Sequence, residues 1–319
     1  MSGPVGRLQQ RGYALALVLA GLLLISVAAL ALDERVQRWR ESVQGWGGWV
    51  EQGGQLESAR DEVLARIAVA PLGQLGFVGL RVDGRPYRLP SGIHFSLQDT
   101  RGLLPVAEVQ NEALLRRWLG RQGVKEPELS VLIDSLADYA DRDDLRRLQG
   151  AEVRDYEQAG MPPPRNDWLM SPFELRRVMG WHRRPELWRR ASDWAASTRE
   201  PFLNPNTAPL EVLLAVPGAS QIGVDRLLSE REHSPIGSAE QLQAVTGELW
   251  QRQAWNFHAG IVYRLRLWQP GAPRTLEYTV MLTPEAPAQP WAVLEVRHLP
   301  REPDDPRQPL PAPALPGAR

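Results

Sequence analysis

The stretch NPNTAPLEVLLAVPGASQIGVDRLLSERE, from Asn204 to Glu232, has the residue pattern of two short helices joined by a tight turn. Asn206 or Thr207 is placed to cap the first helix, and Pro209 suits its first turn, where a backbone N–H donor is not needed. A Pro-Gly pair at 217–218 then ends this helix before another begins. The stretch therefore predicts a helix, a hairpin and a second helix.

This pattern resembles helix-hairpin-helix modules, in which a glycine-bearing hairpin offers backbone N–H groups to a nucleic-acid phosphate. One candidate function is therefore a membrane-anchored periplasmic DNA-binding protein, like the competence proteins that bind incoming DNA. Charge argues against it, because six acids and two bases between Asn204 and Trp250 give a net charge of −4 (2 − 6), whereas affinity for phosphates comes from cations. The hairpin also reads PGAS, where the DNA-binding form usually has Pro-Gly-hydrophobic-Gly. We therefore expect that this stretch adopts the helix-hairpin-helix fold but does not bind nucleic acid.

Helical patterns surround this motif and extend over residues 103–255. Two stretches, SPFELRRVMG (Ser171–Gly180) and SAEQLQAVTG (Ser238–Gly247), begin with Ser, carry Glu or Gln three residues later and end at Gly. This arrangement is a capping box, so both stretches predict short capped helices. NEALLRRWLGRQGV and ELSVLIDSLADYADRDD also carry apolar residues at helical spacing. We expect an all-α domain here.

Short alternating segments predict strands on both sides of this helical domain. FVGLRVDG, RPYRLP and GIHFSLQDT precede it, whereas GIVYRLRLW, RTLEYTVMLT and PWAVLEVRH follow it, and QPGAP predicts a hairpin turn between the first two of the latter. The predicted fold class is α+β, with the helical domain inserted between the strands of an α/β domain. That α/β domain comprises residues 33–102 and 256–299. Seven prolines among residues 300–319 predict a disordered or extended tail.

An uncharged run of twenty residues, Tyr13–Leu32, lies near the start of the chain. At helical rise it matches a hydrocarbon core of roughly 30 Å, and it is longer than the roughly 7–15 apolar residues of a signal peptide. Arg7 and Arg11 precede it without an acid. We therefore predict a single transmembrane helix with the N-terminus in the cytoplasm and the bulk of the chain in the periplasm. Beyond it, apolar residues at helical spacing predict a further helix, with one face formed by Leu56, Ala59, Val63 and Ile67.

The residues that carry common enzyme chemistry are absent from the sequence. Without cysteine the chain has no disulfide, thiolate metal site or cysteine nucleophile. The five histidines show no HExxH spacing, and the sequence has no GxSxG, GxxxxGK or GxGxxG motif. We therefore predict that this chain is not an enzyme.

An acidic segment, DSLADYADRDDLRRLQGAEVRDYE, carries eight carboxylates. Calcium binds six to eight oxygen ligands, so several carboxylates on one loop would supply a site. The alternative is a solvated face neutralised by the neighbouring arginines, and the spacing is not that of an EF-hand. Both interpretations stay open on residue types alone. The neighbouring arginines are Arg142, Arg146, Arg147 and Arg154.

Taken together, these features resemble the K-type minor pseudopilins of bacterial type II secretion systems. The start resembles a prepilin peptidase site, with a leader over residues 1–12 and cleavage between Gly12 and Tyr13. LADYADRDD…GAEVRDYE resembles the family's acidic loop, SPFELRRVMG its capped helix, and LNPNTAPLEVLLAVPG its Asn-x-Asn-Thr-Ala signature. The family fold is a pseudopilin α/β domain with a large helical domain inserted between its strands.

The resemblance also implies a function and a set of partners. Leu17 is the fifth residue after the cleavage site, where most pilin-like subunits carry glutamate; an apolar residue there implies a tip subunit with no neighbour above it. Such a subunit starts assembly of the pseudopilus with I- and J-type minor pseudopilins for protein export across the outer membrane. Other pseudopilins, the inner-membrane platform and the prepilin peptidase are further implied partners, and the secretin and the cargo are candidates. Family members bind calcium in the helical domain, which favours as ligands Asp138, Asp141, Asp143, Glu152 and Asp155.

Overall fold

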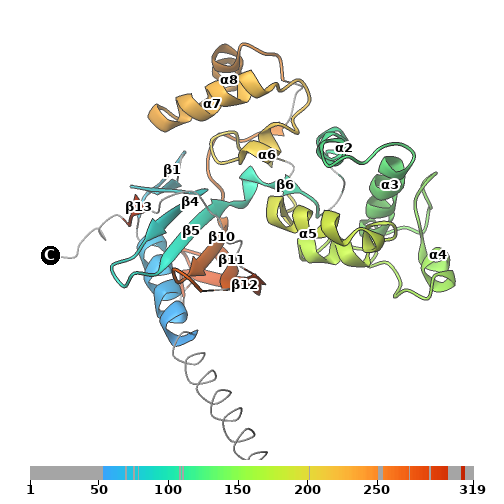
Figure 1. Ribbon diagram of the computed structural model, residues 1–319, viewed down its shortest axis with the longest axis horizontal. Coiled ribbons are helices and arrows are strands. Elements are labelled where there is room, and N and C mark those ends of the chain that lie inside the picture. Colours follow the sequence, from blue (N-terminus) through green and yellow to red (C-terminus); the bar gives the residue numbers. More distant parts are fainter. Residues whose placement is uncertain are drawn as a thin grey trace, which may run out of the picture. The chain divides into compact units, whose positions relative to one another are not determined.

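Six strands form the main sheet of the protein, in the order β12-β11-β10-β5-β4-β13 (Figure 1). All neighbouring pairs are antiparallel except β13 and β4, which are parallel. The strands span β4 Asp83–Arg88, β5 His94–Asp99, β10 Val262–Trp268, β11 Arg274–Leu282, β12 Trp291–Pro300 and β13 Leu310–Pro311. The computed structural model describes residues 53–312 except 69, 75, 78, 108, 110, 201, 251–253, 273, 287–288 and 301–309.

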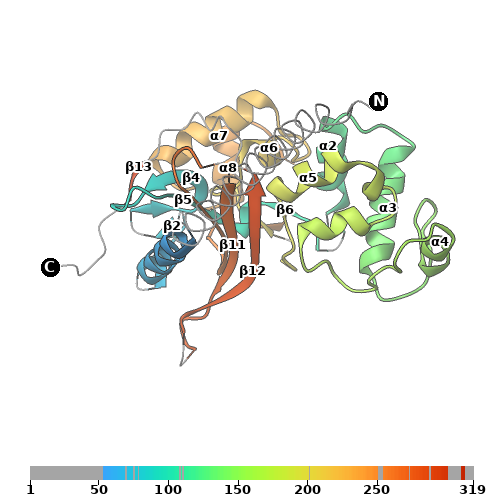
Figure 2. The same cartoon turned by 60° about the horizontal axis from the view of Figure 1, so that its bottom comes forward.

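The two central strands, β5 and β10, are neighbours although residues 100–261 separate them in the sequence. Leu97 lies opposite Leu265 in their register, and both side chains are fully buried. Successive side chains of a strand point to opposite faces, so the alternating sequence gives the sheet a covered face. β11 and β12 run side by side as a long hairpin (Figure 2). The predicted α+β class is confirmed, with a helical segment between two adjacent strands.

The segment between β5 and β10 contains seven α-helices and three 3₁₀ turns among its described residues. Two pairs of short parallel strands cross it, β6 Leu104–Pro105 with β7 Ala195–Ala196 and β8 Phe202–Leu203 with β9 Ala254–Trp255. The α-helices are α2 Glu112–Arg121, α3 Glu128–Ala140, α4 Val153–Gln158, α5 Pro185–Trp194, α6 Leu210–Leu213, α7 Gln221–His233 and α8 Ala239–Thr246. The 3₁₀ turns are η1 Thr100–Gly102, η2 Pro172–Arg177 and η3 Trp181–Arg183.

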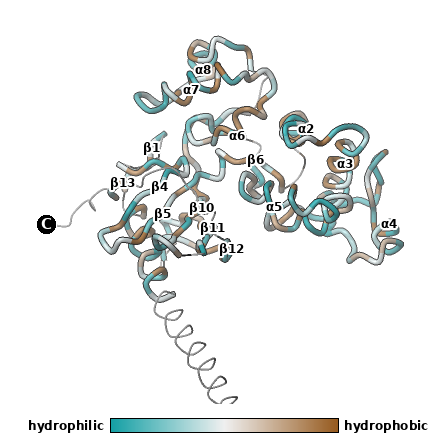
Figure 3. Tube along the Cα trace, in the orientation of Figure 1, coloured by the Kyte–Doolittle hydropathy of each residue, from teal (hydrophilic) through white to brown (hydrophobic). Residues whose placement is uncertain are grey.

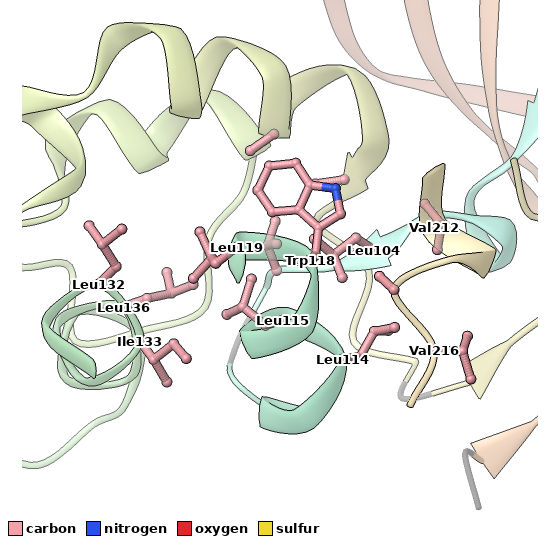
Figure 4. Close-up of a cluster of buried hydrophobic side chains, with 14 of the residues drawn as sticks. Leu104, Leu114, Leu115, Trp118, Leu119, Leu132, Ile133, Leu136, Val212 and Val216 are labelled. Carbon is pink, nitrogen blue, oxygen red and sulfur yellow. The ribbon is translucent and has the colours of Figure 1, made fainter. Parts of the chain in front are cut away.

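The apolar core of this segment is built around α2. Two pairs of apolar residues four positions apart, Leu114 with Trp118 and Leu115 with Leu119, give the helix a wide buried face. Figure 4 shows these side chains between those of α3 and those of the segment that contains α6. Hydrophobic residues are accordingly prominent along α3 and α6, whereas α4 is mostly hydrophilic (Figure 3).

The two predicted capping boxes differ in the type of helix that they cap. Ser238 caps α8 by accepting a hydrogen bond from Gln241 N at 3.2 Å, as predicted. Ser171 likewise caps a short helix, η2, by accepting from Phe173 N at 3.3 Å, and this helix is of the 3₁₀ type. In both stretches the residue three positions after the cap accepts from the backbone N–H just before the cap: Glu174 from Met170 N at 2.9 Å and Gln241 from Gly237 N at 2.8 Å.

The tail does not match the prediction of disorder over its whole length. Leu310 and Pro311 form β13 and pair with Tyr87 and Arg88 of β4. A proline is tolerated there because β13 is an edge strand, where one side of the backbone needs no ladder hydrogen bond. These two residues are extended, which is the other form predicted for the tail.

The chain divides into two compact units, Met1–Ser58 and Ala59–Arg319. Residues 53–68 are helical, and Ala59, Val63 and Ile67 are buried. A small three-stranded sheet follows, composed of β1 Leu72–Gly73, β2 Gly76–Phe77 and β3 Leu80–Arg81. Within the described residues no helix is both long and apolar enough to cross a membrane. The predicted cleavage site, transmembrane helix and Leu17 lie outside them.

Candidate functional site

Asp99, the last residue of β5, is fully buried, and its carboxylate accepts four hydrogen bonds. Oδ2 accepts from Asn204 Nδ2 at 3.1 Å and from Thr207 Oγ1 at 2.9 Å. Oδ1 accepts from the backbone N–H groups of Arg101 at 3.1 Å and Gly260 at 3.2 Å. Burial raises the pKa of Asp99 above its ordinary value, although the four donors act to lower it. One carboxylate, which we call the Asp99 node, thus joins both connections between the sheet and the helical segment.

The other polar side chains of the Asn-x-Asn-Thr-Ala signature are also buried and satisfied. Asn206 Oδ1 accepts from Ile236 N at 2.8 Å, and Asn206 Nδ2 donates to the carbonyl oxygens of Ile236 and Phe257 at 2.9 and 3.0 Å. Neither Asn206 nor Thr207 caps a helix, because the N-cap of α6 is Pro209. The predicted capping role is therefore wrong, and tertiary partners take these side chains instead.

Three acidic side chains come together where α3 ends and α4 begins. Asp138 lies in the last turn of α3, Asp141 is its C-cap, and Glu152 is the N-cap of α4. Asp138 is 0% exposed and Glu152 6% exposed. Asp138 accepts from Arg147 N at 3.1 Å, and its Oδ1 lies 3.3 Å from Arg147 Nε. We call Asp138, Asp141 and Glu152 the acidic cluster.

The acidic cluster is incompletely satisfied by the protein. Both carboxylate oxygens of Glu152 and Oδ1 of Asp141 are buried without a hydrogen-bond partner. An ionised carboxylate buried without partners is costly, so such oxygens are suited to hold a proton, a water molecule or a cation. A Cβ added at Gly150 would collide with Asp138 Oδ2, so the loop backbone approaches this carboxylate as only glycine allows.

The electrostatics of the acidic cluster agree with this geometry. Burial raises the pKa of Asp138 to about 6, with the charge of Asp141 acting in the same direction. Burial and the charges of Asp138 and Asp141 raise the pKa of Glu152 to about 7. Burial also raises the pKa of Asp141. Without a cation these three groups therefore oppose one another's ionisation at neutral pH.

The remaining two predicted ligands are engaged elsewhere. Asp155 Oδ2 accepts from Glu152 N at 2.9 Å, and its Oδ1 pairs with Arg146 at 3.1 Å. Asp143 is exposed and accepts from Leu145 N at 2.8 Å. In the part of the chain that the structure describes, no three acidic, histidine or cysteine residues already stand in metal-binding geometry. The sequence thus predicted the acidic loop, but it missed the Asp99 node, whose signal was an acidic residue at the end of an otherwise apolar and polar alternating strand.

Residues 96–196 match the family model of the type II secretion system (T2SS), protein K. The predicted resemblance to K-type pseudopilins is confirmed. The matched region includes Asp99 and the whole acidic cluster.

The chain is also similar in fold to a chain of the crystal structure of the GspK-GspI-GspJ complex from the type 2 secretion system of enterotoxigenic Escherichia coli. The TM-score is 0.57 at 16% sequence identity, over 82% of this chain and 99% of that chain. At this identity the likeness concerns the fold alone. No curated protein sequence matches the chain significantly.

Proposed function

We propose that this chain is a K-type minor pseudopilin that starts pseudopilus assembly at the filament tip, together with I- and J-type minor pseudopilins. The observation that carries the proposal is the match of residues 96–196 to protein K, which covers the junction between β5 and the helical segment. The similarity to a chain of a K-I-J complex supports the partners. The role is structural: the chain acts by packing against its neighbours for protein export, without catalysing a reaction.

The geometry suggests how such a subunit would end a filament. A helical domain inserted between β5 and β10 adds bulk to one end of the sheet, so that a further subunit cannot stack there. The Asp99 node fixes the entry and exit of this domain. Contacts from β10 provide a second attachment: Arg264 donates to the carbonyl oxygens of Asp193 at 2.7 Å and of Ala195, at the end of α5. Cations at a helix C-terminus are favourable for the exposed carbonyl oxygens and for the helix dipole.

The N-terminal region would supply the membrane step of this function. We propose cleavage after Gly12 by a prepilin peptidase, methylation of the new N-terminus at Tyr13, and retention of the helix 13–32 in the inner membrane until assembly. The domain beyond it would lie in the periplasm. Mass spectrometry of the protein from cells with an active peptidase should show a chain starting at Tyr13, and an intact Met1 would contradict this step.

A calcium ion would suit the acidic cluster, and we propose that Asp138, Asp141 and Glu152 hold it, with Asp143 and Asp155 as secondary candidates. The support is the set of buried carboxylate oxygens without partners, since oxygen atoms are the ligands that calcium prefers. Bound calcium would supply positive charge to this site. Titration of the chelator-stripped chain with calcium should release heat and saturate, whereas a titration without binding would leave a solvated acidic loop.

Co-purification tests the main proposal. The full chain, tagged after Arg319 and co-expressed with I- and J-type partners, should be recovered from detergent extracts with both partners in equal amounts. Leu17→Glu serves as a matched variant, because it would place an unpaired carboxylate in the membrane, at a cost of about 3 kcal/mol. It should keep the partners but start fewer filaments. Recovery of the chain alone, together with tight binding of DNA at low salt, would instead support the competence-receptor alternative.

A further inference from the structure

The carboxylate of Glu248 lies against the hairpin between α6 and α7, at the start of α7. Glu248 directly follows Gly247, the C-cap of α8. Its Oε2 accepts from the backbone N–H of Ser220, the N-cap of α7, at 3.1 Å, and its Oε1 accepts from the Ser220 hydroxyl. Trp250 Nε1 donates to Oε2 at 2.8 Å. Three donors therefore converge on one carboxylate that lies just beyond the end of α8.

The first turn of α7 is shaped around this carboxylate. A Cβ added at Gly223 would collide with Glu248 Oε2, so the carboxylate rests directly on the backbone of the helix. The Ser220 hydroxyl donates to Glu248 and accepts from Gly223 N at 3.2 Å, which completes the cap. α7 is thirteen residues long, and the N-terminus of such a helix favours an anion. Although burial acts to raise it, hydrogen bonds from Ser220 and Trp250 hold the pKa of Glu248 below its ordinary value.

By the resemblance of its sequence to helix-hairpin-helix modules, this hairpin is the part that would offer backbone N–H groups to a phosphate. In this chain Ser220 stands where the DNA-binding form has its second glycine, and its N–H points to Glu248. We propose that Glu248 is an internal substitute for the phosphate, so that the hairpin is closed to nucleic acid and instead clamps the end of α8 to the start of α7. The contacts of Glu248 would stabilise the hairpin in the absence of a bound phosphate. The proposal does not depend on the proposed pseudopilin function.

Chemical rescue of Glu248→Ala tests the clamp. The full chain, the variant and the control Glu230→Ala, which removes the same charge from the same module, are melted in sodium chloride and in sodium sulfate at equal ionic strength. We expect Glu248→Ala to melt at least about 3 °C lower than wild type in chloride. Sulfate raises the melting temperature of all three proteins by salting-out, and the gain in wild type and Glu230→Ala measures this general effect. In Glu248→Ala, sulfate is an oxyanion that fits the emptied position. It should therefore add a further gain of at least half of the loss seen in chloride. Equal melting of Glu248→Ala and wild type, or an equal gain from sulfate in all three proteins, would overturn the proposal.

Two measurements that do not use Glu248→Ala keep the proposal testable if this variant folds poorly, and a third separates the proposal from the pseudopilin function. Glu248→Gln keeps the shape of the side chain but replaces one acceptor by a donor, so it should show a smaller loss and a smaller rescue by sulfate. Wild type should not bind a fluorescent DNA duplex at low salt, and tight binding by wild type would show that the hairpin is open. Recovery of I- and J-type partners by Glu248→Ala would show that the pseudopilin function stands independently of the clamp.

Discussion

Two groups of buried carboxylates in this chain have opposite relations to their surroundings. Asp99 accepts four hydrogen bonds from the protein, and every one of them comes from a neutral donor. The acidic cluster, by contrast, has buried oxygens on Glu152 and Asp141 that receive none. Asp99, Asp138 and Glu152 are all buried, so burial alone does not distinguish a structural carboxylate from a candidate binding one. The number of satisfied oxygen atoms does, because a buried anion must be compensated by something.

A third buried carboxylate, Glu277 in β11, shows another way to compensate. It lies against the arginines Arg264, Arg266 and Arg297, with Arg266 Nε at 2.6 Å and Arg264 Nε at 3.6 Å. Burial acts to raise its pKa, but the three arginine charges dominate and lower the pKa of Glu277 to about 2. Neutral donors thus compensate Asp99, arginine cations compensate Glu277, and calcium is the proposed partner of the acidic cluster. Each case predicts a different response to perturbation.

The largest effect is expected at Asp99. Asp99→Ala would leave the donors of Asn204, Thr207 and Gly260 buried without an acceptor, at a cost of about 3–5 kcal/mol in the free energy of unfolding. Urea unfolding followed by tryptophan fluorescence measures this loss. Asp143→Ala is the control, since it removes an exposed carboxylate with a local bond. A loss below about 1 kcal/mol for Asp99→Ala would mean that the node does not hold the two connections together.

The next largest effect concerns acid stability and Glu277. Its folded pKa of about 2 lies below the ordinary value near 4.5, so its contribution is fully present above pH 4.5 and is lost as the pH falls toward 2. The shift corresponds to about 3 kcal/mol. Glu277→Gln should therefore be less stable than wild type at pH 7, and the difference between them should shrink as the pH falls to 2.5. A difference that stays constant over this range would show that packing, and not charge, makes Glu277 important.

The sequence predicted most of the secondary structure because local signals determine it. Ser238 and Gly247 bound α8 as their residue types indicate, and the alternation in GIHFSLQDT and GIVYRLRLW predicted β5 and β10. The Asp99 node could not be predicted this way, because its partners at 204, 207 and 260 are distant in the sequence. The predicted helix-capping role of Asn206 and Thr207 is wrong for the same reason, because their partners are also distant in the sequence. Their side chains suit a helix cap equally well, and only the folded chain offers them better partners.

A moderate effect is expected from calcium at the acidic cluster, with a defined dependence on pH. In the metal-free chain the folded pKa values of Asp138 and Glu152, about 6 and about 7, lie above their ordinary values. Their protons therefore favour the folded state at low pH, and this contribution is lost as the pH rises from about 4 to 7. Calcium at a hundredfold excess over its dissociation constant would add about 2.7 kcal/mol at pH 7.5. At pH 5.5 protons occupy the same oxygens, so the increase in melting temperature should be much smaller, and an equal increase at both pH values would point to a calcium site elsewhere.

The smallest effect is expected for Asp143→Asn, and its comparison with Asp138→Asn distinguishes the exposed from the buried members of the acidic loop. Asp138→Asn should abolish the stabilisation by calcium, because Asp138 is buried at the centre of the cluster and faces Gly150. Asp143→Asn should change the free energy of unfolding in calcium by less than about 0.5 kcal/mol, since Asp143 is exposed and bonds only to Leu145 N among the contacts described for its side chain. Thermal melts of both variants with calcium and with chelator measure the difference. Equal losses in the two variants would mean that calcium draws the exposed loop inward, and that the ligand set extends beyond the carboxylates that are already buried.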